Sequence, residues 1–145
     1  MRIALGSDHA GFPLKSDLAR RLAGQGHEVL DMGCFDEMSV DYPDQAGPVC
    51  DAVLDGRAER GVLVCNTGIG MSIAANRRRG IRAALCLCTT MAAMARRHND
   101  ANVLVLGAGL TAPFLAHEIL EAFLAGAFEG GRHARRVEKL DSPNG

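Results

Sequence analysis

Apolar and polar positions alternate along the chain in two repeating patterns. Short runs of apolar residues, typical of strands buried on both faces, are separated by segments with apolar residues four apart, typical of helices covered on one face. In one such segment Leu14, Leu18 and Leu22 share a helical face. Strands are predicted over residues 2–7, 27–31, 60–65, 81–86 and 102–106, and helices over residues 11–24, 44–54, 70–78, 89–97 and 111–125.

Five strand–helix units in a row predict an α/β fold with a parallel sheet between two helical layers. We expect a three-layer α/β/α, Rossmann-like domain over residues 1–145, with strand order 2-1-3-4-5 and a basic C-terminal helix in the tail, residues 130–145. Pro48 is predicted to confine the regular part of the second helix to its later turns, or to be an early position in it.

Composition narrows the function without identifying it. The chain has 145 residues, 48% of them hydrophobic, and a formal net charge of −1, which gives no argument for binding nucleic acid or membranes. No apolar run is long enough to span a bilayer, and the N-terminus enters a strand without a signal-peptide pattern, so a cytoplasmic location is expected. The five cysteines match no zinc pattern and suit a reducing compartment.

The strongest chemical signal lies in residues 62–76, VLVCNTGIGMSIAAN, where a strand ends in Cys65 and a glycine-rich turn leads into a helix. Free N–H groups and the dipole at the start of that helix would favour the thiolate of Cys65 and form a pocket for anionic oxygen. The alternative is a small, buried, apolar cysteine beside glycines that serve only the turn.

Other polar residues follow the first strand of the predicted sheet. Ligands of open α/β sheets bind beyond the carboxyl ends of strands, where the strand order reverses. Asp8 and His9 end the first strand, so we expect them to converge with Cys65 and Thr67 in one crevice. Alternatively, Asp8 caps the following helix and His9 is a surface histidine.

Two further groups lie away from that crevice. His98 and Asn99 lie between the fourth helix and the fifth strand, on the opposite rim, so they belong either to a plain loop or to a site on a neighbouring subunit of a two-fold dimer. Arg132 and Arg136 are four apart in the basic tail, a spacing that suits a phosphate; the alternative is a solvated surface helix.

Five blocks carry a resemblance that covers nearly the whole chain. They are GSDHAGFPLK at the start, DYPD at 41–44, CNTGIGMSIAAN at 65–76, RRHNDANVLVLG at 96–107 and EGGRHARRVEKL at 129–140. Together, in this order and spacing, they resemble the type B ribose-5-phosphate isomerase family, which also includes galactose-6-phosphate isomerase subunits. The resemblance implies interconversion of ribose 5-phosphate and ribulose 5-phosphate through a cis-enediolate, with no metal or nucleotide cofactor.

The resemblance also implies a role for each candidate residue. Cys65 matches the base, Thr67 and His98 match residues that open the furanose ring, and Asp8 lies nearby. The phosphate contacts are His9, Arg132 and Arg136; the backbone anion hole is Asn66, Thr67, Gly68, Ile69 and Gly70; and Asn99 matches a substrate-binding position. Because family members bind the sugar phosphate between two subunits, a homodimer is expected, and pairing of two dimers into a tetramer stays open.

This chain departs from the family pattern near the base. Gly109 replaces an arginine that reaches the phosphate in many members, and Asn66 stands where glycine is frequent. A related branch lacks the cysteine and uses a glutamate one turn on; that position here is Met71, which leaves Cys65 as the only base of either type. Alternative substrates therefore stay open: erythrulose 4-phosphate, allose 6-phosphate and galactose 6-phosphate. A non-catalytic Rossmann-like nucleotide-binding module is a further alternative, although the first turn, G-S-D-H-A-G, lacks the G-x-G-x-x-G fingerprint.

Overall fold

The fold is built on one five-stranded parallel sheet with the order β2-β1-β3-β5-β4. The computed structural model describes residues 1–142. The strands are β1 (Arg2–Ser7), β2 (Glu28–Asp31), β3 (Arg60–Cys65), β4 (Ala83–Leu85) and β5 (Val103–Gly107). The helices are α1 (Phe12–Gly24), α2 (Tyr42–Leu54), α3 (Ile69–Asn76), α4 (Thr89–Asn99), α5 (Pro113–Ala125) and α6 (Arg132–Leu140).

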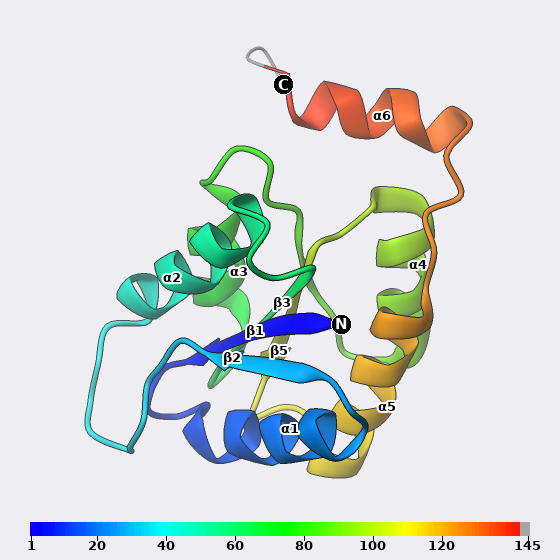
Figure 1. The fold of residues 1–145 in the computed structure, drawn as a ribbon. Helices are drawn as coiled ribbons and strands as arrows, with labels where there is room; N and C mark the ends of the chain where they lie inside the picture. Colours follow the sequence, from blue (N-terminus) through cyan, green and yellow to red (C-terminus); the bar gives the residue numbers. More distant parts are fainter. Residues whose placement is uncertain (143–145) are drawn as a thin grey trace.

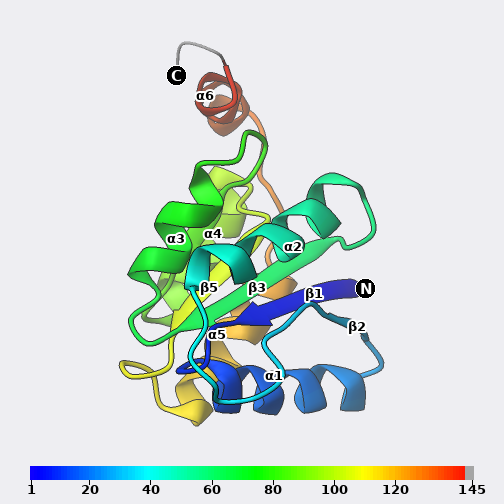
Figure 2. The same cartoon turned by 90° about the vertical axis from the view of Figure 1, so that its left-hand side faces the viewer.

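Helices cover both faces of the sheet, as Figures 1 and 2 show. One hydrophobic cluster joins the sheet to α1, α4 and α5, and a second joins its other face to α2 and α3. The central strands β3 and β5 contribute to both clusters, because alternate side chains of a strand point to opposite faces. The predicted three-layer α/β/α architecture is therefore confirmed.

The predicted strand order was wrong at one edge, because β5 lies between β3 and β4. All five residues of β5 are buried, whereas the three residues of β4 are only partly buried, so the longer apolar run occupies the centre. Crossover handedness agrees with this order. The chain crosses the sheet in the same direction from β1 to β2 and from β4 to β5, so right-handed crossovers place α1 and α4 on the same face.

Two helices extend further than the sequence pattern predicted. Helix α2 begins at Tyr42 with Pro43 in its first turn, so Pro48 lies inside the helix and the prediction for Pro48 was wrong. Helix α4 continues through His98 and Asn99, which were predicted to lie in the following loop. They nevertheless precede β5, on the rim opposite the carboxyl end of β3, as predicted.

Helix α6 confirms the predicted basic helix in the tail and lies apart from the sheet (Figure 1). Asp141, just after α6, connects it to the body: its carbonyl oxygen accepts a hydrogen bond from Arg79 at 2.9 Å, and its carboxylate pairs with Arg82 at 2.8 Å. Residues 143–145 of the predicted tail lie outside the described part of the chain. Among the described helices, none combines the length and apolar character that a membrane crossing requires.

Candidate active site

The carboxyl ends of β1, β3 and β5 meet at one rim of the sheet. The N–H of Asp8 donates to the carbonyl of Val64 at 3.2 Å, and the N–H of Ala108 donates to the carbonyl of Cys65 at 2.8 Å. The predicted neighbourhood of the first and third strands is thus present. Because β5 rather than β4 adjoins β3, the loop that starts at Ala108 also borders Cys65.

Cys65 lies deep in this rim, with 5% of its surface exposed. Its Sγ accepts the backbone N–H of Gly68 at 3.1 Å. Gly68 has a φ of 79°, a left-handed conformation, and a Cβ there would lie 2.4 Å from Cδ1 of Leu85, so only glycine fits this turn. Helix α3 starts directly afterwards, so the sulfur accepts a backbone N–H at a helix N-terminus, as the sequence predicted.

The remaining cysteines have different surroundings. Burial raises the pKa of the Cys50 thiol to about 11 and that of Cys86 to about 12, so both stay protonated at neutral pH. Cys34 donates its S–H to the carbonyl oxygen of Asp36 at 3.2 Å. The description of a small, inert, buried cysteine therefore fits Cys50 and Cys86.

Asp8 and His9 each have a defined hydrogen bond beside this rim. Oδ1 of Asp8 accepts the N–H of Gly11 at 2.9 Å, so Asp8 supports the turn before α1. It is not the helix cap, because the N-cap of α1 is Gly11 and has no side-chain cap. Nδ1 of His9 accepts the N–H of Val40 at 3.3 Å. A neutral imidazole that accepts at Nδ1 carries its proton on Nε2, so His9 offers an N–H donor to a ligand.

The predicted anion-hole residues follow Cys65 directly: residues 66–68 form the turn, and Ile69 and Gly70 begin α3. Oγ1 of Thr67 accepts the N–H of Ile69 at 3.3 Å. The sequence prediction did not name Tyr42 as a site residue, yet its ring lies against Gly70. A Cβ on Gly70 would come within 2.7 Å of Cζ of Tyr42. The DYPD block at 41–44 was the available signal for Tyr42, because it contains this residue, although the family resemblance assigned Tyr42 no role.

Four predicted site residues do not join this rim within one chain: His98 and Asn99 end α4, and Arg132 and Arg136 belong to α6. The His98 ring instead stacks on His133, with centroids 4.2 Å apart and planes 4° apart. Its Nε2 is 3.6 Å from Oε2 of Glu129.

The same cluster contains the one group of side chains in residues 1–142 with metal-like spacing. The ligand atoms of His98, Glu129 and His133 lie within 4.8 Å of one another, a grouping that the sequence analysis missed although Glu129 and His133 are four apart. The parallel rings direct their nitrogen lone pairs side by side rather than toward one point. Arg97 also pairs with Glu129 at 2.5 Å and neutralises it. This geometry fits an ion-pair network better than a metal site.

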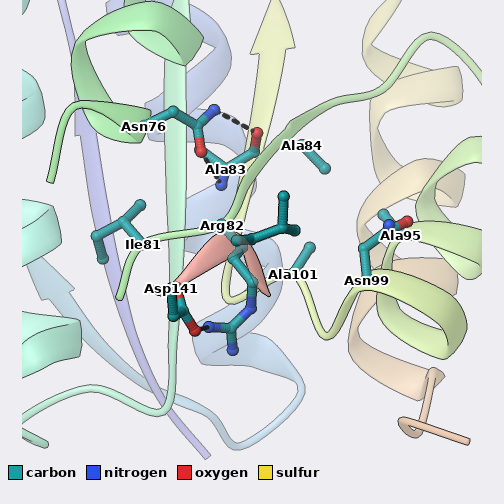
Figure 3. A pocket seen from close by; sticks show the side chains of 10 residues that line it. Asn76, Ile81, Arg82, Ala83, Ala84, Ala95, Asn99, Ala101 and Asp141 are labelled. Carbon is teal, nitrogen blue, oxygen red and sulfur yellow. Dashed lines mark hydrogen bonds and ion pairs between the residues drawn. The ribbon is translucent and has the colours of Figure 1, made fainter. Parts of the chain in front are cut away.

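A cavity of about 410 Å³ lies away from Cys65, at the free edge of β4 (Figure 3). Asn99 lines it, together with Arg82, which pairs with Asp100 and Asp141. Asn76 closes part of the strand edge, because its side-chain amide bonds both the N–H and the carbonyl of Ala83 at 2.8 Å. Within one chain, Asn99 therefore lines this cavity and lies away from the rim at Cys65.

Comparison with known proteins shows which family the chain belongs to. The sequence profile described as Ribose/Galactose Isomerase matches residues 3–140. The chain belongs to the ribose/galactose isomerase family. Ribose-5-phosphate isomerase B of Escherichia coli is 44% identical over 139 residues, covering 96% of this chain and 93% of the relative. D-erythrulose-4-phosphate isomerase of Pectobacterium atrosepticum is 44% identical over 142 residues, covering 97% and 93%.

Solved structures of the family superpose closely on this chain. A ribose 5-phosphate isomerase of Thermotoga maritima is 54% identical with a TM-score of 0.95, covering 97% of each chain. Ribose-5-Phosphate Isomerase B of Clostridium thermocellum is 48% identical with a TM-score of 0.96, covering 97% of this chain and 95% of the other. Membership of an isomerase family replaces the alternative of a non-catalytic nucleotide-binding module.

Proposed function

We propose that this family member interconverts ribose 5-phosphate and ribulose 5-phosphate, with Cys65 as the base. The names of the E. coli and T. maritima relatives support the substrate pair. The observation that carries the assignment of the base is the 3.1 Å hydrogen bond from the Gly68 N–H to Sγ of Cys65. No carboxylate competes for the role one turn further on, since that position is Met71.

The sugar enters the reaction as a closed ring, so ring opening comes first. One group must donate a proton to the ring oxygen while another accepts the proton of the anomeric hydroxyl. We assign these transfers to His98 and the hydroxyl of Thr67, with the nearby Asp8 carboxylate orienting the substrate.

The isomerisation itself moves one proton between neighbouring carbons. The Cys65 thiolate removes the proton from C2 of the open aldose, and the electron pair of the C–H bond shifts toward the carbonyl to form the cis-enediolate. The N–H groups of residues 66–70 stabilise the developing negative charge, a contribution of roughly 3–4 kcal/mol per well-placed donor. The cysteine then returns the proton to C1 as the C2 hydroxyl gives up its proton and becomes the carbonyl. A proton also passes to the C1 oxygen, which yields the ketose.

The substrate phosphate requires residues that one chain holds far from Cys65. We propose that Nε2–H of His9 contacts the phosphate from one subunit, while Arg132 and Arg136 come from the other. In the same homodimer His98 and Asn99 of the partner subunit complete the sugar site. A two-fold axis would bring the two opposite rims together twice and form two equivalent sites.

The organisation of the enzyme follows from the same proposal. Residues 1–145 form one isomerase domain, and the tail from residue 130 packs at the subunit interface. A sugar phosphate is the ligand. We also propose a cytoplasmic location, a compartment in which its five unpaired cysteines stay reduced.

A four-carbon substrate is the second candidate. The P. atrosepticum relative named D-erythrulose-4-phosphate isomerase is as similar in sequence as the E. coli relative, at 44% identity. Gly109 also leaves the site one cation short of what the family resemblance leads one to expect, so the phosphate is expected closer to Arg132 and Arg136 and the substrate size stays open. Comparing kcat/KM for ribose 5-phosphate and erythrulose 4-phosphate, with a metal chelator present, ranks the two candidates.

The decisive variant for the mechanism is Cys65→Ala. Loss of the general base should lower kcat for ribose 5-phosphate by about 10²- to 10⁴-fold, while a phosphorylated sugar-acid mimic of the enediolate should still bind in calorimetry. The matched control is Cys88→Ala, which removes an exposed thiol and should keep turnover near wild type. Near-normal turnover in Cys65→Ala would remove Cys65 from the mechanism.

A further inference from the structure

Asn66 and Gly109, the two positions that depart from the family pattern beside the base, contact each other. The N–H of Gly109 donates to the backbone carbonyl of Asn66 at 2.8 Å, next to the hydrogen bond from the Ala108 N–H to the Cys65 carbonyl. These bonds continue the pairing of β3 and β5 beyond the sheet. The backbone of Asn66 is therefore fixed against that of Gly109, one residue after Cys65.

The side chain of Asn66 occupies the space that any side chain at position 109 would need. A Cβ on Gly109 would lie 2.3 Å from Oδ1 of Asn66 and 3.2 Å from its backbone oxygen. Both distances are below ordinary van der Waals contact, and the first requires one group to move. Oδ1 and Cγ are among the three atoms nearest to that point, whereas Nδ2 is not, so the amide nitrogen points away from Gly109.

This arrangement leaves the amide N–H groups of Asn66 available to a ligand. Asn66 is exposed, whereas the neighbouring Cys65 is buried, so Asn66 lies on the outward side of the base. A substrate whose reacting carbons reach the Cys65 sulfur must extend its charged, hydrated end outward. An amide nitrogen at this position is a neutral donor suited to a phosphate oxygen.

We infer that the side-chain amide of Asn66 contacts the substrate phosphate and that Gly109 is a positioning residue, because its missing side chain lets the amide lie over it. The inference rests on the proposed function for the identity of the ligand. Any larger residue at position 109 displaces the amide by rotating it, since the clashing atom is the free end of a side chain. The two positions therefore act as one unit.

A double-mutant cycle tests this coupling. Calorimetry measures the Kd of inorganic phosphate for the wild type, Asn66→Ala, Gly109→Ala and the double variant, and kinetics gives KM and kcat for ribose 5-phosphate. Asn66→Ala should raise Kd and KM about three- to tenfold, the loss of one exposed hydrogen bond, with kcat little changed. Gly109→Ala should cause a similar rise, and the double variant should be no worse than either single variant.

Gly24→Ala is the matched control, because a Cβ at Gly24 would meet no atom within 4 Å and the backbone there is not left-handed. It should leave Kd, KM and kcat unchanged. Three results would each overturn the inference. They are an unchanged phosphate Kd in Asn66→Ala, no phosphate binding by the wild type, and a Gly109→Ala change that raises Kd as much in the Asn66→Ala background as in the wild type. Failure of the proposed function would appear separately, as wild-type protein that binds phosphate without isomerising ribose 5-phosphate.

Discussion

Lys15 offers a test of how the core supports the site, because its side chain is fully buried in α1. Its Nζ donates to Oδ1 of Asp31 at 2.5 Å and to the carbonyl oxygen of Cys34 at 2.7 Å. The same ammonium lies 5.2 Å from the ring centroid of Phe35. Lys15 thus holds the start of the loop over residues 33–41, whose other end donates the Val40 N–H to His9.

The variant Lys15→Met keeps most of the side-chain volume and removes these bonds. Breaking a buried ion pair from one side costs about 3–5 kcal/mol. The lower end applies, because the Asp31 side chain is 37% exposed and water can solvate the carboxylate that remains. At an unfolding entropy of roughly 2.1 cal/mol/K per residue, a loss of about 3 kcal/mol lowers the Tm of a chain of this length by about 10 °C.

Thermal melts at one protein concentration measure this shift, and Lys139→Met is the control because Lys139 is the other lysine of the chain and is exposed. The control should shift the Tm by less than about 2 °C. Loosening of the loop should also raise KM more than it lowers kcat, since His9 loses its orientation. If Lys15→Met melted within 2 °C of the control, the buried ammonium would contribute no net stability and this reasoning would be refuted.

Two further predictions concern the opposite rim. Burial, with the neighbouring charges of His98, Arg132 and Arg136, holds the pKa of His133 below its usual 6.5. Because the unfolded chain then binds the proton more readily, the stability measured in thermal melts should fall as the pH drops through 6.5. The fall should be smaller in His133→Asn. Equal amounts of the inactive Cys65→Ala and His98→Ala variants, mixed and allowed to exchange subunits, should regain about one quarter of wild-type turnover. Half of the dimers are then mixed, and each mixed dimer holds one intact site and one dead site. A mixture as inactive as its components would show that both residues act within one chain.

Local sequence was sufficient for most of the elements and for the position of Cys65 at the end of β3. Apolar runs and four-residue repeats predicted every strand and helix of the sheet layers to within a few residues. The turn after Cys65 was readable because glycine at a left-handed position is a local requirement. By contrast, Pro48 suggested a shortened helix, yet packing of α2 against the sheet outweighed the one lost backbone bond.

Contacts between distant segments were not readable in this way. Lys15 has the polarity of a surface residue, and its burial depends on Asp31 and Cys34, which arrive from later in the chain. The stacking of His98 on His133 depends on how the tail returns to α4. Neither pair has a spacing that the sequence pattern alone could interpret.

The sequence by itself determined the α/β class, the thiol at the end of β3 and the basic tail, because these depend on periodicity and on residues close together in the chain. Only the tertiary structure decided that β5 rather than β4 lies beside β3, since strand pairing is chosen by competition among whole apolar surfaces. That choice places Gly109 against Asn66 and leaves His98 on the far rim. The neighbours of the Cys65 thiol are therefore set by long-range packing, which no single stretch of the sequence contains.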